Sequence, residues 1–243
     1  MKSEAAENPL GYEKISTLLK GFAIPSVIAM LVSSLYNIVD QIFIGQGVGY
    51  LGNAATNVAY PLTTICLAIA LLIGIGSASR FSLYLGSGMK EKAADVVGNG
   101  VCMMFLFGIL YAVLVELFLD PLLTAFGATA DVMPYAVSYT RITAVGMPFL
   151  IVTNAVCNLA RADGSPKYSM VCMLVGAVLN TILDPIFIFV FHQGVAGAAI
   201  ATVIGQFFSF LMAVRYLWNF KQVKLERKNF RLSAKECLTT ASL

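Results

Sequence analysis

The sequence predicts an all-α, polytopic membrane protein, built as a bundle of six transmembrane helices. Hydrophobic residues make up 58% of the chain and charged residues only 12%, about half the charged fraction of a typical soluble domain. The apolar residues lie in six runs separated by short polar breaks. A length of 243 residues leaves room for roughly this many spans joined by short loops.

Each run is long enough to cross a bilayer core as a helix. Strands are not expected, because a membrane barrel would need segments of about ten residues with alternating hydrophobicity. Residues 1–17 form a polar, cytoplasmic N-terminal segment without the apolar core of a signal peptide, and residues 219–243 form a basic cytoplasmic linker. The six-helix lobe between them, residues 18–218, has runs at approximately 18–44, 55–77, 93–119, 132–159, 169–191 and 195–218.

The first run carries polar residues towards its C-terminal end. Tyr36 and Asn37 precede Asp40 by four and three positions, so all three lie close to one face of a helix. Pro25 interrupts the same run nearer its start and supplies a point at which the helix can bend.

The second and third runs supply no candidate site residue. The glycines of GQGVGYLG, between the first two runs, formally spell GxGxxG. Because they follow a membrane helix and not a strand, we expect a turn there and no nucleotide site.

The fourth run places Tyr139 near its start and Asn154 farther along. Arg141 is the exception to the charge pattern described below, and we expect it to pair with an acidic residue at the same end of the bundle.

The fifth run contains LNTILDPIFIF, in which Asn180 and Asp184 stand one helical turn apart on the same face. Pro185 removes a backbone donor directly after the aspartate and loosens the helix at that level. The sixth run adds Thr202, together with small residues spaced for close helix contact.

The basic residues set the orientation. Of the 16 lysines and arginines, all but Arg141 fall in segments on one side of the predicted membrane. The positive-inside rule therefore predicts that both termini are cytoplasmic. The basic residues lie in loops and form no patch interleaved with aromatics, so nucleic acid is not an expected partner.

With this orientation, the rise of about 1.5 Å per residue places Asp40, Tyr139, Asn180, Asp184 and Thr202 in one layer of the outer half of the membrane. A carboxylate in hydrocarbon is costly and marks a functional site by default. The pair Asp40 and Asp184 can hold a proton, or a sodium ion with oxygen atoms of Asn180 and Thr202. The competing interpretation is a set of buried hydrogen bonds that only join helices.

Several sequence blocks resemble the multidrug and toxic compound extrusion (MATE) transporters. The resemblance rests on Pro25, on YNIVDQIFIG around Asp40, on RFSLYLGSGMKEKA and NLARADGSPK in two loops, on LNTILDPIFIF, and on GVAGAAIATVIGQ. It covers about residues 15–220.

The resemblance implies cation coupling at Asp40, Asn180, Asp184 and Thr202, by a proton or a sodium ion that serves as the coupling ion; no other cofactor is expected. It also implies helix bending at Pro25 and Pro185 and export of cationic, often aromatic drugs across a bacterial or archaeal plasma membrane. Neighbouring pathway residues would be Tyr36, Asn37, Tyr139 and Asn154.

MATE transporters have twelve spans in two lobes, so the resemblance also implies a second six-helix lobe as a partner. The alternatives are a lipid-linked precursor flippase, which should carry more basic residues in its cavity, and a non-transporting membrane assembly subunit. An intramembrane aspartyl protease is disfavoured because the GxGD motif does not occur. We therefore expect a secondary transporter, an antiporter, with no catalytic residues.

Overall fold

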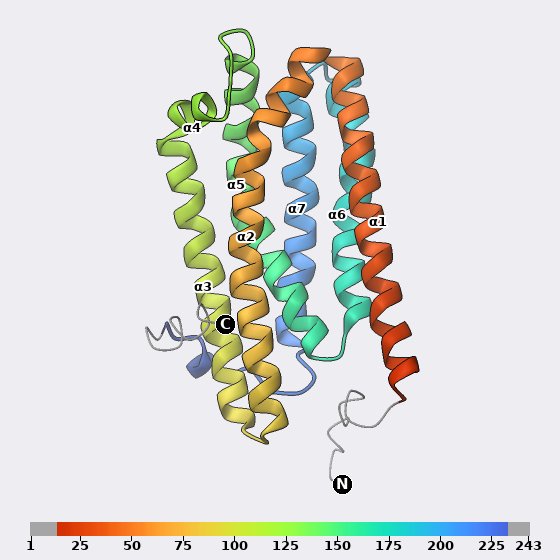
Figure 1. Ribbon diagram of the computed structural model, residues 1–243, viewed down its shortest axis with the longest axis vertical. Helices are drawn as coiled ribbons and strands as arrows, with labels where there is room; N and C mark the ends of the chain where they lie inside the picture. Colours follow the sequence, from red (N-terminus) through yellow and green to blue (C-terminus); the bar gives the residue numbers. More distant parts are fainter. Residues whose placement is uncertain (1–13, 233–243) are drawn as a thin grey trace.

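The computed structural model describes residues 14–232, and every regular element among them is helical. Six helices are long and apolar enough to cross a membrane, as predicted, and they run side by side along the molecule (Figure 1). They are α1 (Ile15–Gly47), α2 (Tyr50–Gly86), α3 (Lys90–Leu117), α5 (Met133–Ala162), α6 (Pro166–Pro185) with its π-helical continuation η2 (Ile186–Val190), and α7 (Gly194–Trp218).

Two short helices complete the fold: α4 (Leu119–Ala125) and the 3-10 turn η3 (Arg227–Asn229). Residues 120–131 were expected to form only a break, and α4 occupies the first half of it. Pro121 is tolerated there because it lies in the first turn, where its missing N–H group has no helical partner. Leu119 and Leu123 are buried and hold α4 against the bundle.

The helices extend past the apolar runs. With 37 residues, α2 is about 55 Å long, which exceeds the roughly 30 Å of hydrocarbon in a bilayer. The start of α1 and the end of α7 lie at the same end of the bundle, where α2 and α3 also project farthest (Figure 1). Residues 15–17, assigned above to the N-terminal segment, belong to α1, and residues 1–13 and 233–243 lie outside the described residues.

The core lies around α5, the most buried of the six long helices. It packs against α2, α3, α6 and α7. Phe81, Leu62, Met104 and Ile151 are among the large side chains that are completely or almost completely buried there.

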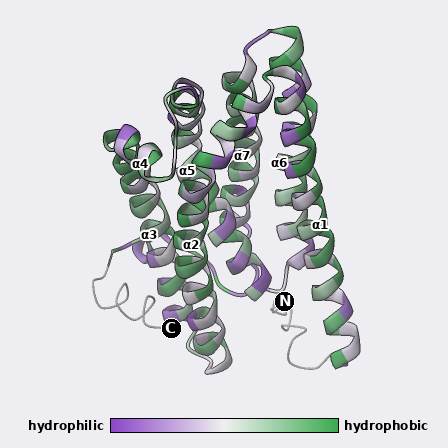
Figure 2. Cartoon of the chain, turned by 45° about the horizontal axis from the view of Figure 1, so that its top comes forward, coloured by the Kyte–Doolittle hydropathy of each residue, from purple (hydrophilic) through white to green (hydrophobic). Residues whose placement is uncertain are grey.

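In contrast, α1 lies at the edge of the bundle and is the least buried span. Its main neighbour is α6, and it touches α2 and α7 much less. Near its C-terminal end, Ile44 is buried with Ile188 and Ala198, and the Phe43 ring meets Phe189 edge to face. Hydrophobic residues predominate along the long helices (Figure 2), and many large ones are exposed, as expected for contact with lipid or with another apolar surface.

Candidate functional site

The polar residues of α6 point into the bundle. Asp184 is fully buried and Asn180 is 3% exposed. The side-chain amide of Asn180 donates to Asp184 Oδ1 at 3.1 Å and to Thr202 Oγ1 on α7 at 3.2 Å. Asn180 and Asp184 therefore share a face of α6, as predicted, and Asn180 links that face to Thr202 on α7.

Small residues bring α6 and α7 close enough for this contact. A Cβ atom added to Gly205 would lie 2.7 Å from the backbone oxygen of Gly176, and one added to Gly197 would lie 2.9 Å from the backbone of Phe187. Glycine is required at both positions because the obstructing atoms belong to backbone.

Asp40 reaches the same pocket from α1 and is 7% exposed. Its carboxyl group is within hydrogen-bonding reach of the carboxyl group of Asp184. Tyr139, on α5, lies beside both carboxyl groups, and its hydroxyl contacts Thr202. Four helices thus contribute one polar cluster, which we call the acidic cluster: Asp40, Tyr139, Asn180, Asp184 and Thr202.

Three acceptor atoms of the acidic cluster are buried without a hydrogen-bond partner: Asp40 Oδ1, Asp184 Oδ2 and Asn180 Oδ1. An acceptor without a partner in a low-dielectric interior costs a few kcal/mol, and an unneutralised carboxylate costs more. All three atoms can accept a proton-bearing group or coordinate a cation, and none can donate when the carboxyl groups are ionised. These three oxygen atoms therefore suit a proton or a small hard cation such as sodium.

A cavity of about 280 Å³ adjoins the acidic cluster, with Asn180 and Thr202 in its wall. Three of the predicted neighbours, Tyr36, Asn37 and Asn154, also line this cavity. Asn37 and Asn154 donate to backbone oxygen atoms of their own helices, so the structure brings them to the cavity and not into the acidic cluster.

Several residues of the cavity wall were not predicted as site residues, and two of them carry unpartnered polar atoms. Thr153 Oγ1 and Gln206 Oε1 line the cavity and are buried without a partner. Threonine and glutamine are common between membrane helices as packing and hydrogen-bonding residues. The only local signal was that Gln206 lies one turn from Thr202 and Thr153 beside Asn154.

The two predicted bending points differ in local structure. The π-helical turn η2 follows Pro185 directly, so the helix is wider immediately after Asp184. Pro25 lies inside α1, which remains one helix from Ile15 to Gly47.

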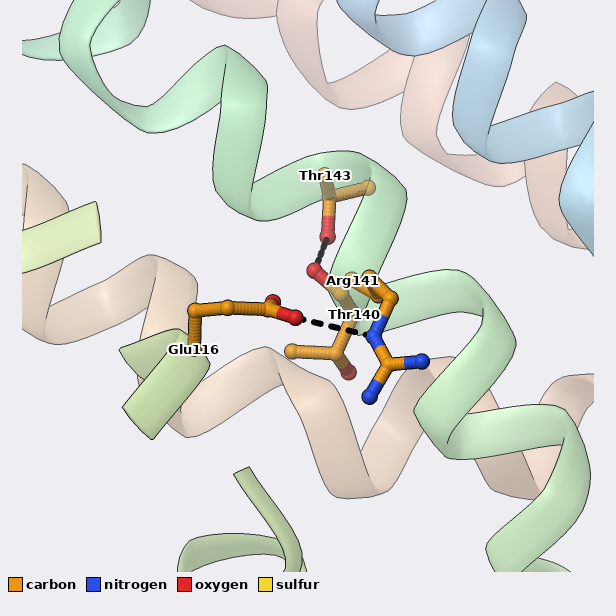
Figure 3. A network of polar contacts seen from close by, with 4 residues as sticks. All are labelled: Glu116, Thr140, Arg141 and Thr143. Atoms are coloured by element: carbon orange, nitrogen blue, oxygen red, sulfur yellow. Dashed lines mark hydrogen bonds and ion pairs between the residues drawn. The ribbon is translucent and has the colours of Figure 1, made fainter. Parts of the chain in front are cut away.

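Near the end of the bundle where α3 meets α4, and two residues after Tyr139 on α5, Arg141 pairs with Glu116 on α3, with Nε and Oε1 2.9 Å apart (Figure 3). This is the acidic partner predicted for Arg141. The side chains are 63% and 44% exposed, so the pair is worth little free energy and serves mainly to neutralise a basic residue at that end.

Comparisons with known proteins agree with this architecture. Residues 25–186 match the family model MatE. The chain is 30% identical over 234 residues to the multidrug export protein MepA of Staphylococcus haemolyticus (strain JCSC1435), a match that covers 93% of this chain and 49% of that protein. It is 29% identical over 195 residues to MepA of Staphylococcus aureus (strain NCTC 8325), covering 80% of this chain and 43% of that one. The chain thus spans about half the length of the curated relatives it matches.

Solved structures of transporters superpose on this chain over most of its length. A multidrug resistance MATE family transporter in an outward-facing conformation superposes with a TM-score of 0.84 at 27% identity, covering 91% of this chain and 49% of that one. A MOP superfamily transporter from Pyrococcus furiosus superposes with a TM-score of 0.88 at 26% identity, covering 98% and 53%. The six helices and the matched residues therefore establish that this chain belongs to the MatE family of membrane transporters.

Proposed function

We propose that this chain forms the N-terminal lobe of a cation-coupled multidrug exporter, and that the coupling cation, a proton or a sodium ion, binds between Asp40 and Asp184. The observation that carries the proposal is the set of three unpartnered acceptors on Asp40, Asp184 and Asn180. A bound cation would satisfy these atoms and neutralise the carboxylates in one step.

Both cations suit the chemistry of the acidic cluster. A proton on one carboxyl group would let that group donate to the other, which the contact between Asp40 and Asp184 allows. A sodium ion would use the same two carboxylates, with Asn180 Oδ1 and the Thr202 hydroxyl oxygen as neutral ligands.

Coupling to motion would act through α1. This helix is held mainly by α6, and Asp40 and Asp184 lie on the two helices of that interface. Neutralising the pair removes the repulsion between them and favours a closer approach of α1 to α6. Pro25 and the wide turn after Pro185 are points where either helix can yield without breaking many hydrogen bonds.

The cavity beside the acidic cluster suits the drug. Its lining mixes polar and apolar side chains, carries no charged residue, and includes the aromatic rings of Tyr36 and Tyr60. A cationic aromatic molecule can stack there and be attracted by the nearby carboxylates. Drug and coupling cation would then compete for the same negative charge, which is the requirement for exchange. The uncharged lining disfavours a flippase for pyrophosphate-linked lipids, which would need basic side chains in the cavity.

Export requires a second six-helix lobe, because alternating access moves two halves around a central site. We place the protein in a bacterial or archaeal plasma membrane with both termini in the cytoplasm, as the distribution of basic residues indicates.

The test is efflux of a cationic aromatic dye from cells that express the chain together with a second lobe, under an imposed proton or sodium gradient. Asp40→Asn and Asp184→Asn should each reduce gradient-driven efflux at least about tenfold, since removing one carboxylate removes the charge that the cation neutralises. Asp120→Asn, an exposed acid outside the acidic cluster, is the matched control.

Unchanged efflux in both cluster variants would refute the coupling role. Varying pH at fixed sodium, and then sodium at fixed pH, identifies the coupling ion. A correctly folded chain that exports nothing with any second lobe would instead support a role as an assembly subunit.

A further inference from the structure

The segment that follows α7, residues 219–232, is fixed to the end of the bundle by a buried carboxylate. Asp163, just after α5, is completely buried and accepts hydrogen bonds from the Tyr216 hydroxyl at 2.6 Å and from the backbone N–H groups of Lys221 and Gln222 at 2.8 and 2.9 Å. Burial raises the pKa of this carboxyl group, and the three hydrogen bonds oppose that rise. Two of the three donors belong to the segment and the third, Tyr216, belongs to α7. Asp163 therefore holds the segment against the ends of α5 and α7.

The same segment is also anchored on α2 and α3. The Phe220 ring meets Phe81 edge to face with the ring centres 5.3 Å apart. Farther along, Asn229 donates to Asp95 at 2.6 Å, and its backbone occupies the space where a side chain on Gly98 would lie. The segment therefore crosses from the end of α7 to the projecting end of α3, as Figure 1 shows.

Between this segment, α3 and α7 lies a groove of about 830 Å³. Its wall is apolar where the helices form it, with Val101 and Phe105 from α3 and Leu217 and Trp218 from α7. Trp218 is 82% exposed, and Phe105 is also exposed, so the wall continues into the apolar outer surface of the bundle. An exposed tryptophan at the end of a spanning helix is typical of the membrane–water boundary.

The charged residues that line the groove are all basic: Lys221, Lys224 and Arg227. Within residues 14–232 none of these three side chains forms an ion pair. A neighbouring groove under the same segment differs, since Glu91, Asp95 and Glu226 line it together with basic residues. The first groove therefore combines a positive rim with an apolar wall at the level of the membrane boundary.

We propose that this groove, defined by Val101, Phe105, Trp218, Lys221, Lys224 and Arg227, binds an anionic phospholipid. The phosphate of the headgroup would lie among the three basic side chains, and an acyl chain would lie along the wall formed by α3 and α7. Charge complementarity selects an anion. The apolar wall, open to the outer surface of the bundle, selects a lipid over a free phosphate ion.

Trp218 supplies a direct test because it is the single tryptophan of the chain. The chain is reconstituted in phosphatidylcholine vesicles that contain either brominated phosphatidylglycerol or brominated phosphatidylcholine at equal mole fraction. Bromine quenches tryptophan fluorescence on contact, so the ratio of quenching measures the preference for the anionic lipid. We expect a preference of about fivefold or more in the wild type.

The groove variant K221Q/K224Q/R227Q should bring that preference close to one. The control variant K14Q/K20Q/K167Q removes three exposed positive charges outside the groove and should retain it. Quenching by brominated phosphatidylcholine reports whether each variant is correctly inserted. An equal response to both lipids in the wild type, or a preference that survives in the groove variant, would overturn the proposal. So would displacement of the lipid by millimolar inorganic phosphate, which would indicate a simple anion site.

Discussion

The closeness of α6 and α7 should decide whether the acidic cluster forms, and Gly205→Ala tests this. The added Cβ atom would lie 2.7 Å from the backbone oxygen of Gly176. Ordinary van der Waals contact begins near 3.4 Å, so the two helices must separate by about 0.7 Å at this level. The obstructing atom belongs to backbone, and no rotation of a side chain can relieve the clash.

Thr202 lies one turn before Gly205 on the same helix, so it moves with this separation. Its 3.2 Å hydrogen bond from Asn180 would lengthen to about 3.9 Å, beyond the range of a hydrogen bond. Overpacking costs about 1–3 kcal/mol, and a hydrogen bond between membrane helices contributes about 0.6 kcal/mol. We therefore expect a loss of about 2–4 kcal/mol in stability, together with weaker gradient-driven efflux.

The assay is thermal unfolding in detergent, combined with the dye efflux measurement described above. Gly21→Ala is the matched control, because a Cβ atom at Gly21 meets nothing within 4 Å. A Gly205→Ala protein as stable and as active as the Gly21→Ala protein would show that close contact between α6 and α7 does not support the acidic cluster.

Three further substitutions test the ends of the bundle. Tyr216→Phe removes a 2.6 Å hydrogen bond to the buried Asp163 carboxylate, so thermal unfolding should reveal a loss of about 1.5–3 kcal/mol. Gly98→Ala places a methyl group against the backbone of the 219–232 segment, and amide hydrogen exchange there should rise while exchange in α5 does not. Arg141→Gln breaks the exposed pair with Glu116 and should change the unfolding free energy by less than about 1 kcal/mol.

Each of these three predictions has a result that would contradict it. Tyr135→Phe, at a partly exposed tyrosine on α5, controls for loss of a hydroxyl, and an equal effect of the two tyrosine substitutions would contradict the role given to Asp163. Unchanged exchange in Gly98→Ala would mean that the segment does not depend on contact with α3. A large destabilisation by Arg141→Gln would mean that the pair with Glu116 is shielded from solvent far more than its exposure indicates.

The spans and the acidic cluster could be predicted because both follow from local rules. Apolar runs of bilayer length reveal the helices, and a rise of about 1.5 Å per residue converts sequence position into depth. That conversion places Asp40, Asp184 and Thr202 in one layer from sequence position alone. Depth does not fix which face of a helix meets which neighbour, so it could not distinguish the acidic cluster from the cavity beside it, where Asn37 and Asn154 lie.

Two other features that were not predicted, the anchoring of residues 219–232 by Asp163 and the helix α4, depend on contacts that leave no local pattern. Asp163 holds Gln222 from 59 positions away, and neither the loop ARADGSPK nor the basic segment shows a periodicity that would reveal the pairing. A helix as short as α4, with seven residues, is below the length at which apolar periodicity is informative. Its position is fixed by burial of Leu119 and Leu123 and not by helix propensity.

The distribution of packing across the bundle places the proposed coupling cation where it can have a mechanical effect. The centre of the lobe, around α5, is tightly packed and gives little room for movement. By contrast α1 contacts the bundle mainly through α6, and the Asp40–Asp184 pair lies in that interface. If a cation binds there as proposed, neutralising two buried carboxylates would change the free energy of this helix contact by several kcal/mol, and about 5.5 kcal/mol shifts a two-state equilibrium from 1:99 to 99:1. The α2–α5 core, where most contacts are buried, offers less freedom of movement, so the α1–α6 interface is the better place for a proposed coupling cation to act.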